Sequence, residues 1–417
     1  MSKKDMLKVA LDVGTYSVTA LVARIKEDGV VDYIAKGESE IKGKSEDYQG
    51  VKFGSVVNME RTTISIRKAL EEAERSADAS IKSVLLGLSG KGLESMNNTG
   101  KISVRGRKVV QTDIDKVIDL AKEVTLPSNR KIVHVEVIEF TVDDRNGIKN
   151  PRGMAGKTLE VEVHIITASS TMLQDLTKSV EDAGVRVEDV IPNTIASSYA
   201  VLEEDEKKLD VVLLDVGEGT TDIAVFRDGK PVRSAVFPMG GHYITRDICH
   251  AMRIPPDEAD RIKKEHGSAI PDSISDDDEV EVSTIGSREK RVKKVKFLAN
   301  VILARVTDIM QNMASVIDKE KISPTSAIVI TGGTANLRYI TAPVEEVLKY
   351  NVRIGKPVIN IDDLSLATEL NNPEYSAAVG MIQYHVNSSK MPFRPRENGA
   401  CSRFWKAVSE MLRNFFE

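Results

Sequence analysis

A short phrase built on aspartate, glycine and threonine occurs twice in the 417-residue chain, once in each half. Asp12-Val13-Gly14-Thr15 ends an apolar, strand-like run, and residues 215–222 (DVGEGTTD) end a second one. Glycine lets the backbone approach a phosphate, threonine offers a hydroxyl group, and aspartate can hold a hydrated Mg²⁺ ion. The duplication therefore predicts a nucleotide held between two lobes. The alternative is a pair of ordinary β-hairpin turns, which each phrase alone fits well.

A third segment of the same kind favours the nucleotide interpretation. Residues 327–335 (AIVITGGTA) form a buried-type strand that runs into Gly332 and Gly333 just before a predicted helix. Such a segment presents free N–H groups to an anion or to a nucleoside. Three segments in this order predict a single ligand site.

The elements around the two phrases are also repeated. Three strands followed by a helix are predicted over residues 9–13, 18–24, 30–37 and 58–77, and again over 211–215, 222–226, 234–238 and 244–252. Two related lobes that face each other leave a cleft between them, where ligands commonly bind.

These residues resemble the actin-like ATPase superfamily, and within it the FtsA family of bacterial cell-division proteins. The family is indicated by residues 147–156 (GIKNPRGMAG) and 163–167 (VHIIT), which are similar to the end of a small domain that FtsA proteins carry. Residues 195–202 and 374–380 resemble the two interdomain helices, whose small residues allow a close, hinge-like crossing.

The resemblance implies an α/β fold: an actin-like two-lobed fold of duplicated RNase H-like domains with an inserted small α+β domain and a C-terminal amphipathic helix. The implied boundaries are 1–83 and 165–200 for the lobe 1 core, 84–164 for the insert, 201–249 and 320–385 for the lobe 2 core, 250–319 for a lobe 2 subdomain, 386–402 for a flexible linker and 403–417 for the terminal helix. The insert is implied to contact the next subunit in a filament. The alternative is a stabilising excursion without a partner.

By the same resemblance the chain binds ATP with Mg²⁺, and Asp12 and Asp215 hold the metal. The ATP-binding residues that it implies are Asp12, Gly14, Thr15, Tyr16, Asp215, Gly217, Glu218, Gly219, Thr220, Thr221, Gly240, Gly241, Arg261, Lys264, Gly332, Gly333 and Thr334. Three positions depart from the usual pattern. Glu218 and Thr334 stand where glycine is frequent, and Asn193 lies near the position of the residue that orients the attacking water. Asparagine is a poor substitute there, so we expect slow hydrolysis and assign no catalytic residue.

A basic block lies between an acidic stretch, residues 272–278, and a helix predicted over 297–313. The acidic stretch is predicted to be a mobile loop. In FtsA proteins this region binds the C-terminal tail of the tubulin-like division protein FtsZ, and Arg288, Arg291 and Lys294 are the candidate contacts here. The alternative interpretation is an ordinary solvated face. The functional interpretation is that the basic block forms a docking groove for an acidic peptide.

The C-terminal residues form an amphipathic pattern after a polar stretch. The apolar face at helical spacing comprises Phe404, Trp405, Val408, Met411, Leu412, Phe415 and Phe416. Arg403, Lys406 and Arg413 lie opposite this face or at its margin. A short helix of this kind is marginal alone in water, so we expect it to anchor the chain in anionic lipid at the cytoplasmic face of the cell membrane. Packing back onto the globular body is the alternative, which the linker disfavours.

Composition excludes several other classes. With 58 basic and 63 acidic residues the net charge is -5, which argues against nucleic-acid binding. The two cysteines predict neither a disulfide nor a zinc site. The N-terminus lacks the apolar run of a secretion signal. The resemblance implies FtsZ, other copies of the chain, membrane lipids and downstream division proteins as partners at the division site. A pilus-assembly actin-like adaptor and an active ATPase or kinase are the alternatives.

Overall fold

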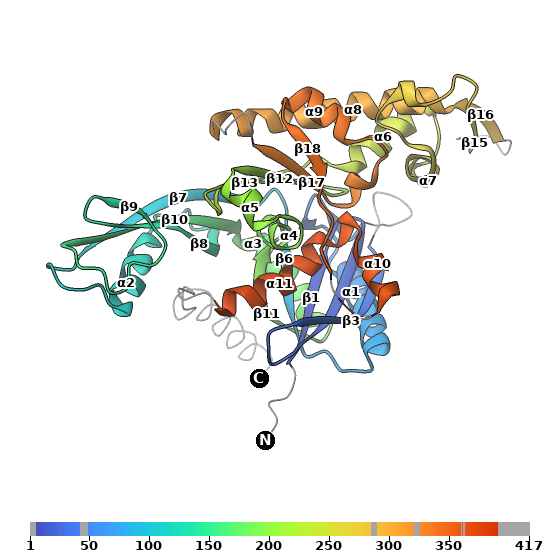
Figure 1. Ribbon diagram of the computed structural model, residues 1–417. Helices are drawn as coiled ribbons and strands as arrows, with labels where there is room; N and C mark the ends of the chain where they lie inside the picture. Colours follow the sequence, from blue (N-terminus) through green and yellow to red (C-terminus); the bar gives the residue numbers. More distant parts are fainter. Residues whose placement is uncertain are drawn as a thin grey trace.

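The computed structural model describes residues 6–41, 49–284, 290–320, 326–359, 361 and 363–390. Two lobes lie one above the other in Figure 1, and an inserted domain projects from one side of them. Both lobes are built around a five-stranded sheet. Residues 391–417 lie outside the described part, and with them all seven residues assigned to the membrane.

Lobe 1 contains a sheet with the strand order β11-β6-β1-β2-β3. Its strands are β1 (Met6–Val13), β2 (Ser17–Ile25), β3 (Val31–Glu40), β6 (Ser83–Leu88) and β11 (Arg186–Pro192), and its helices are α1 (Met59–Ala77) and α3 (Ser170–Asp182). A short hairpin, β4 (Val51–Lys52) and β5 (Ser55–Val56), precedes α1. The Asn58 side chain caps α1 by accepting a hydrogen bond from the Arg61 amide, 3.0 Å away. This cap explains why the helix begins where the sequence predicts.

Lobe 2 repeats this arrangement in the order β14-β13-β12-β17-β18. In each lobe, three consecutive strands pair in antiparallel fashion. Two later strands then extend the sheet from the first of these three strands, and both run parallel to it. The strands are β12 (Val211–Val216), β13 (Thr221–Arg227), β14 (Lys230–Phe237), β17 (Ala327–Thr331) and β18 (Asn351–Ile354). The helices are α5 (Glu204–Lys208), α6 (Gly241–Met252), α7 (Pro256–His266), α8 (Val295–Glu320) and α9 (Thr341–Leu348), with 3-10 turns η2 (Pro271–Ser273) and η3 (Gly333–Asn336).

Part of the basic block of lobe 2 is one strand of a β-hairpin. Strand β15 (Glu279–Ser283) pairs with β16 (Lys290–Lys294), so part of the basic block is a strand. Val280 and Val282 are buried while their neighbours are exposed, and this alternation is the signal for a strand. The acidic stretch, residues 272–278, precedes β15 and contains the end of η2 and turn residues but no α-helix or strand, as expected of a loop.

The insert has its own sheet, in the order β7-β10-β8-β9. It consists of β7 (Leu93–Ser103), α2 (Gln111–Ala121), β8 (Arg130–Val142), β9 (Arg145–Ile148) and β10 (Thr158–Ser169). The implied boundaries of 84–164 are therefore displaced. Strand β6 belongs to the lobe 1 sheet, and β10 pairs with β7 and β8 almost to its end.

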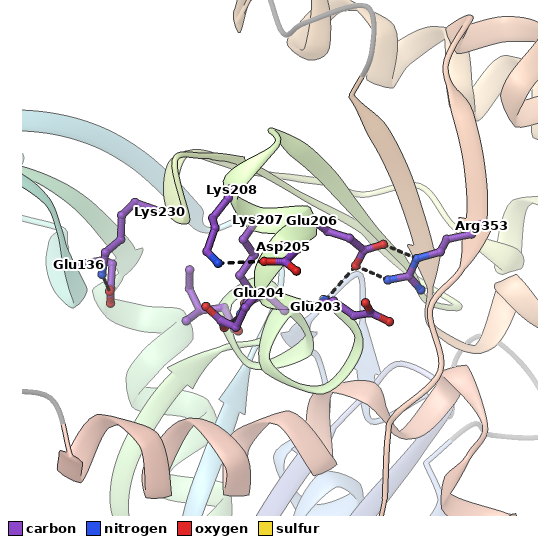
Figure 2. Close-up of polar contacts among 11 residues, drawn as sticks. Glu136, Glu203, Glu204, Asp205, Glu206, Lys207, Lys208, Lys230 and Arg353 are labelled. Carbon is purple, nitrogen blue, oxygen red and sulfur yellow. Dashed lines mark hydrogen bonds and ion pairs between the residues drawn. The ribbon is translucent and has the colours of Figure 1, made fainter. Parts of the chain in front are cut away.

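The insert rests on lobe 2 through strand β14. The Ser95 hydroxyl donates to the Ser234 carbonyl (2.6 Å), and His164 Nε2 lies 3.0 Å from the Ser234 hydroxyl. Lys230 pairs with the half-buried Glu136 at 3.1 Å (Figure 2). The insert is thus joined to lobe 1 through the chain and to lobe 2 through side chains.

Two helices connect the lobes, α4 (Asn193–Val201) and α11 (Ser376–Lys390), preceded by α10 (Leu364–Leu370) and η4 (Pro373–Tyr375). The two helices cross so closely that a Cβ atom added to Gly380 would lie 1.9 Å from the Ala196 carbonyl oxygen. A buried cluster that includes Leu21, Leu213 and Val379 joins both sheets to these helices. Beside them, Arg353 and Glu206 pair at 2.5 Å (Figure 2).

Helix α11 continues through Lys390, so residues 386–390, implied to belong to the linker, are helical. Val386 is buried, which keeps this part of the chain packed as helix. Within the described residues, no helix is long and apolar enough to cross a bilayer.

Candidate functional site

A cavity of about 300 Å³ lies between the lobes. Thirteen of the seventeen implied ATP-binding residues line it: Asp12, Gly14, Thr15, Tyr16, Asp215, Gly217, Glu218, Gly219, Thr220, Lys264, Gly332, Gly333 and Thr334. They come from the β1–β2 turn, the β12–β13 turn, the segment after β17 and helix α7. The fold therefore brings together four segments that lie apart in the sequence.

The two glycine turns have the same local geometry. The Gly14 amide donates to the Ser17 carbonyl, and the Gly217 amide donates to the Thr220 carbonyl, both at 2.9 Å. Each is a β-hairpin turn, as the alternative interpretation holds. They also meet across the cleft, since a Cβ atom on Gly219 would lie 2.3 Å from the Thr15 hydroxyl. Glycine is required at this approach.

Three aspartates, Asp12, Asp215 and Asp222, line the cavity. Burial raises the pKa of Asp12, partly offset by a hydrogen bond from Asn193 (3.0 Å). Burial raises the pKa of Asp215 to about 6, although the Ser197 hydroxyl donates to it at 2.6 Å. Burial, and after it the charge of Asp215, raises the pKa of Asp222 to about 8. Unmet negative charge of this kind favours a bound cation.

The protein supplies few direct metal ligands at this site. In the described part of the chain, no group of three His, Cys, Asp or Glu residues is arranged to hold a metal ion. Mg²⁺ commonly keeps several waters and binds through one or two carboxylates plus substrate phosphates. Asp12 and Asp215 fit that manner of binding.

Glu218 and Thr334, the two departures from the glycine pattern, have partners in the structure. Lys263 lies 3.4 Å from the Glu218 carboxylate and donates to the Thr245 hydroxyl at 2.8 Å, so the glutamate charge is partly balanced. The Thr334 hydroxyl donates to the Gly217 carbonyl at 2.9 Å. This bond ties the segment after β17 to the second glycine turn.

Four implied residues do not line the cavity. Arg261 is the clearest difference, because it pairs with Glu258 and Glu265 along α7 at 2.9 and 2.5 Å. Gly240 and Gly241 lie behind the second turn, where the Gly241 amide donates to the Gly217 carbonyl. Thr221 is buried, and its hydroxyl donates to the Met239 carbonyl at 2.7 Å. Gly240, Gly241 and Thr221 therefore pack against the β12–β13 turn and do not face the ligand site.

Several site residues were not assigned from sequence. Asp222 is the last residue of the second phrase, and the two-residue alternation of a strand places it on the same face as Thr220. This alternation is visible in the sequence and predicts that Asp222 faces the cavity. Ser89 and Ser197 hold Asp222 and Asp215, each at 2.6 Å. No local pattern marks these serines.

The lysine of α7 and the tyrosine of the first turn meet at the cavity wall. Lys264 donates to the Tyr16 hydroxyl at 2.9 Å and lies 4.1 Å from the centre of its ring. Because Tyr16 belongs to lobe 1 and Lys264 to lobe 2, this contact spans the cleft.

Of the residues implied to contact FtsZ, Arg288 lies outside the described part of the chain. Arg291 is exposed on β16. Lys294 pairs with Glu279 of β15 at 2.8 Å, and Lys296 pairs with Asp276 at the same distance. Acidic side chains of β15 and of the acidic stretch therefore neutralise part of the basic block.

Comparison with solved structures defines the class. The chain matches one from the PilM-PilN type IV pilus biogenesis complex with a TM-score of 0.64 and 14% identity, over 92% of this chain and 99% of that one. It matches MreB5 of Spiroplasma citri bound to ADP with a TM-score of 0.53 and 15% identity, over 91% and 98%. At such identities the likeness concerns the fold alone, and the fold is actin-like.

Comparison of sequences narrows the class to one family. The model for the cell division protein FtsA matches residues 212–380, and that for the SHS2 domain inserted in FtsA matches 90–167. The cell division protein FtsA of Escherichia coli strain K12 is 34% identical over 423 residues, 98% of each chain. That of Bacillus subtilis strain 168 is 33% identical over 392 residues, 93% of this chain and 85% of its own. The chain belongs to the FtsA family of cell-division proteins, and the predicted family and insert are confirmed.

Proposed function

We propose that this chain binds ATP with Mg²⁺ in the cavity between its lobes, polymerises on the cytoplasmic face of the cell membrane and anchors FtsZ filaments there. The observation that carries the nucleotide part is the meeting of the two glycine turns, with Asp12 and Asp215 at their base. Membership of the FtsA family supports the cell-division part.

The cavity residues divide into three roles in this proposal. The amides and hydroxyls of the turns at Gly14–Thr15 and Gly217–Thr220 bind phosphate oxygens, because both turns line the cavity. The segment at Gly332–Thr334 holds the nucleoside. Asp12 and Asp215 bind Mg²⁺, in part through water.

Hydrolysis of ATP is expected to be slow. Asn193 begins helix α4, and its amide nitrogen donates to Asp12 at 3.0 Å. An amide held in this way is neither a base nor a good substitute for the glutamine that orients an attacking water. We therefore propose that ATP acts chiefly as a ligand that joins the two lobes.

The affinity for Mg-ATP is expected to rise about tenfold between pH 6 and pH 8.5. The pKa values of Asp215 and Asp222 lie at about 6 and about 8, above that of a free aspartate. A raised carboxyl pKa stabilises the nucleotide-free fold below about pH 4, and this contribution is lost as pH rises through 6 and then 8. The cation favours the ionised groups, so binding releases protons.

Isothermal titration calorimetry in two buffers of different ionisation enthalpy measures the proton release directly. The Asp222→Asn variant serves as the comparison, because it removes the group that titrates near pH 8. Its affinity is expected to stop rising above about pH 7. Proton uptake, or an affinity that falls as pH rises, would contradict the assignment.

The membrane part of the proposal depends on many weak anchors acting together. On the helix predicted from the sequence, seven apolar side chains would give about 6 kcal/mol after ordering costs, a dissociation constant of tens of micromolar. A single subunit would detach readily. Subunits linked in a filament share their anchors, and such avidity can raise attachment by ~10²–10⁴.

Electron microscopy of the chain on anionic lipid monolayers with Mg-ATP tests this part. The full chain is expected to form filaments on the lipid, and a chain that ends at Cys401 is expected to form none there. A monolayer of zwitterionic lipid is the matched control and should bind less protein. Filaments of equal density with the truncated chain would contradict the anchor, and rapid phosphate release without assembly would favour the ATPase alternative.

A further inference from the structure

The β4–β5 hairpin of lobe 1 carries a phenylalanine in an unusual backbone conformation. The two residues at its tip, Phe53 and Gly54, have φ values of 51° and 74°. A two-residue turn with both φ values positive favours Asn-Gly or Gly-Gly, and a bulky residue there is strained. Backbone strain of this kind clusters at functional sites, where the surrounding structure holds it in place.

The Phe53 ring reaches across to lobe 2. It stacks on the Tyr243 ring with centres 5.8 Å apart and planes 21° from parallel. It also meets the His242 ring edge-on at 6.1 Å. Both partners lie in the first turn of α6. These three side chains, here called the aromatic clasp, join the lobes without using the hinge helices α4 and α11.

Both halves of the clasp are held from behind. On lobe 2, Arg246 and Arg305 lie 4.4 and 5.7 Å from the centre of the Tyr243 ring. Asp247 fixes Arg305 at 2.6 Å. Cations placed over an aromatic ring are attracted to it and limit its movement.

On lobe 1, the hairpin tip is seated on the cavity wall. A Cβ atom on Gly54 would lie 2.2 Å from the Ser89 carbonyl oxygen, so the backbones touch. Gly54 and Ser89 both line the cavity, and Ser89 donates to Asp222 of lobe 2 at 2.6 Å. The clasp therefore adjoins the site that the bound ligand occupies.

We propose that the aromatic clasp controls how fast a nucleotide leaves the cavity. The lobes cannot separate at this side until the Phe53 ring leaves Tyr243, so the stack adds to the barrier for opening. The inference rests on the proposed ATP site. An aromatic pair contributes enough beyond its buried area to slow opening about fivefold to tenfold.

The test uses the full chain, loaded with a fluorescent ATP analogue and Mg²⁺ and chased with excess ATP. Phe53→Gly is the main variant, because glycine suits the positive φ and removes the ring without destabilising the turn. We expect dissociation to become about five to ten times faster. Phe53→Tyr keeps a ring and should stay within about twofold of the parent. Val57→Ala, an exposed change just after the hairpin, should leave the rate unchanged.

A double-mutant cycle with Tyr243→Ala separates a clasp from two independent packing effects. If the two rings act as a pair, the double variant releases the analogue no faster than the faster single variant. An unchanged rate in Phe53→Gly, or effects that multiply, would overturn the proposal.

A measurement without nucleotide separates this proposal from the proposed function. In the nucleotide-free chain, Tyr243→Ala is expected to speed amide hydrogen exchange at residues 51–56 of the opposite lobe. If the parent chain bound no ATP analogue, the proposed function would fail, and this exchange experiment would still test the clasp. Unchanged exchange would show that the rings do not hold the lobes together.

Discussion

Replacing Asp215 with asparagine is expected to weaken Mg-ATP binding about 100-fold and to stabilise the nucleotide-free chain at pH 8. The loss of affinity follows because Asp215 is one of the two carboxylates assigned to Mg²⁺. The gain in stability follows because burial raises the pKa of this group to about 6, from 3.8. An ionised Asp215 thus costs about 2–3 kcal/mol at pH 8, and asparagine removes that cost while it can still accept the hydrogen bond from Ser197.

Titration calorimetry and urea unfolding of the same preparations measure these two opposite effects. Asp210→Asn is the matched control. Asp210 precedes the strand with a φ of 60°, which asparagine tolerates, and it does not line the cavity. The control should change neither quantity appreciably. If ATP affinity is unaltered in Asp215→Asn, or if the nucleotide-free variant is less stable than the parent at pH 8, Asp215 is not a buried carboxylate that binds the metal ion.

Replacing Gly380 with alanine is expected to lower the free energy of unfolding by about 3 kcal/mol. The new Cβ atom would lie 1.9 Å from the Ala196 carbonyl oxygen and 3.1 Å from the Ser197 amide nitrogen. Both atoms are backbone atoms, so the hinge helices must move apart. ATP affinity should fall as well, because Ser197 positions Asp215.

Asn387→Ala provides the control on the same helix. Asn387 is exposed on α11, and alanine there favours the helix slightly. Thermal unfolding of both variants measures the difference. A Gly380→Ala chain as stable as the parent would mean that the close crossing of α4 and α11 is not needed for the fold.

Much of the fold is visible in the sequence because its signals are local and repeated. The glycine turns follow apolar strands in both halves, and each half folds into the same five-stranded order. Helix α1 begins after a capping asparagine and places Ile66, Ala69 and Ala73 on its buried face. Periodicity and capping suffice to predict such elements.

The differences arise where distant parts of the chain meet. Strand β6 lies next to the insert in sequence but pairs with β1 and β11, so no local pattern could place it in lobe 1. Ser89 looks like a turn residue until the fold brings it to Asp222. Arg261 is the exception, because its pairing with Glu258 and Glu265 is local to α7 and holds its side chain away from the cavity. Contacts between lobes depend on tertiary structure that a single sequence does not encode locally.

A crystal structure grown with Mg²⁺ and a non-hydrolysable ATP analogue tests the central proposal most directly. We expect the triphosphate between the turns at Gly14 and Gly217, the nucleoside beside Gly332, and one metal ion shared by Asp12 and Asp215. An analogue bound elsewhere, or a cavity that stays without ligand at saturating concentration, would contradict it.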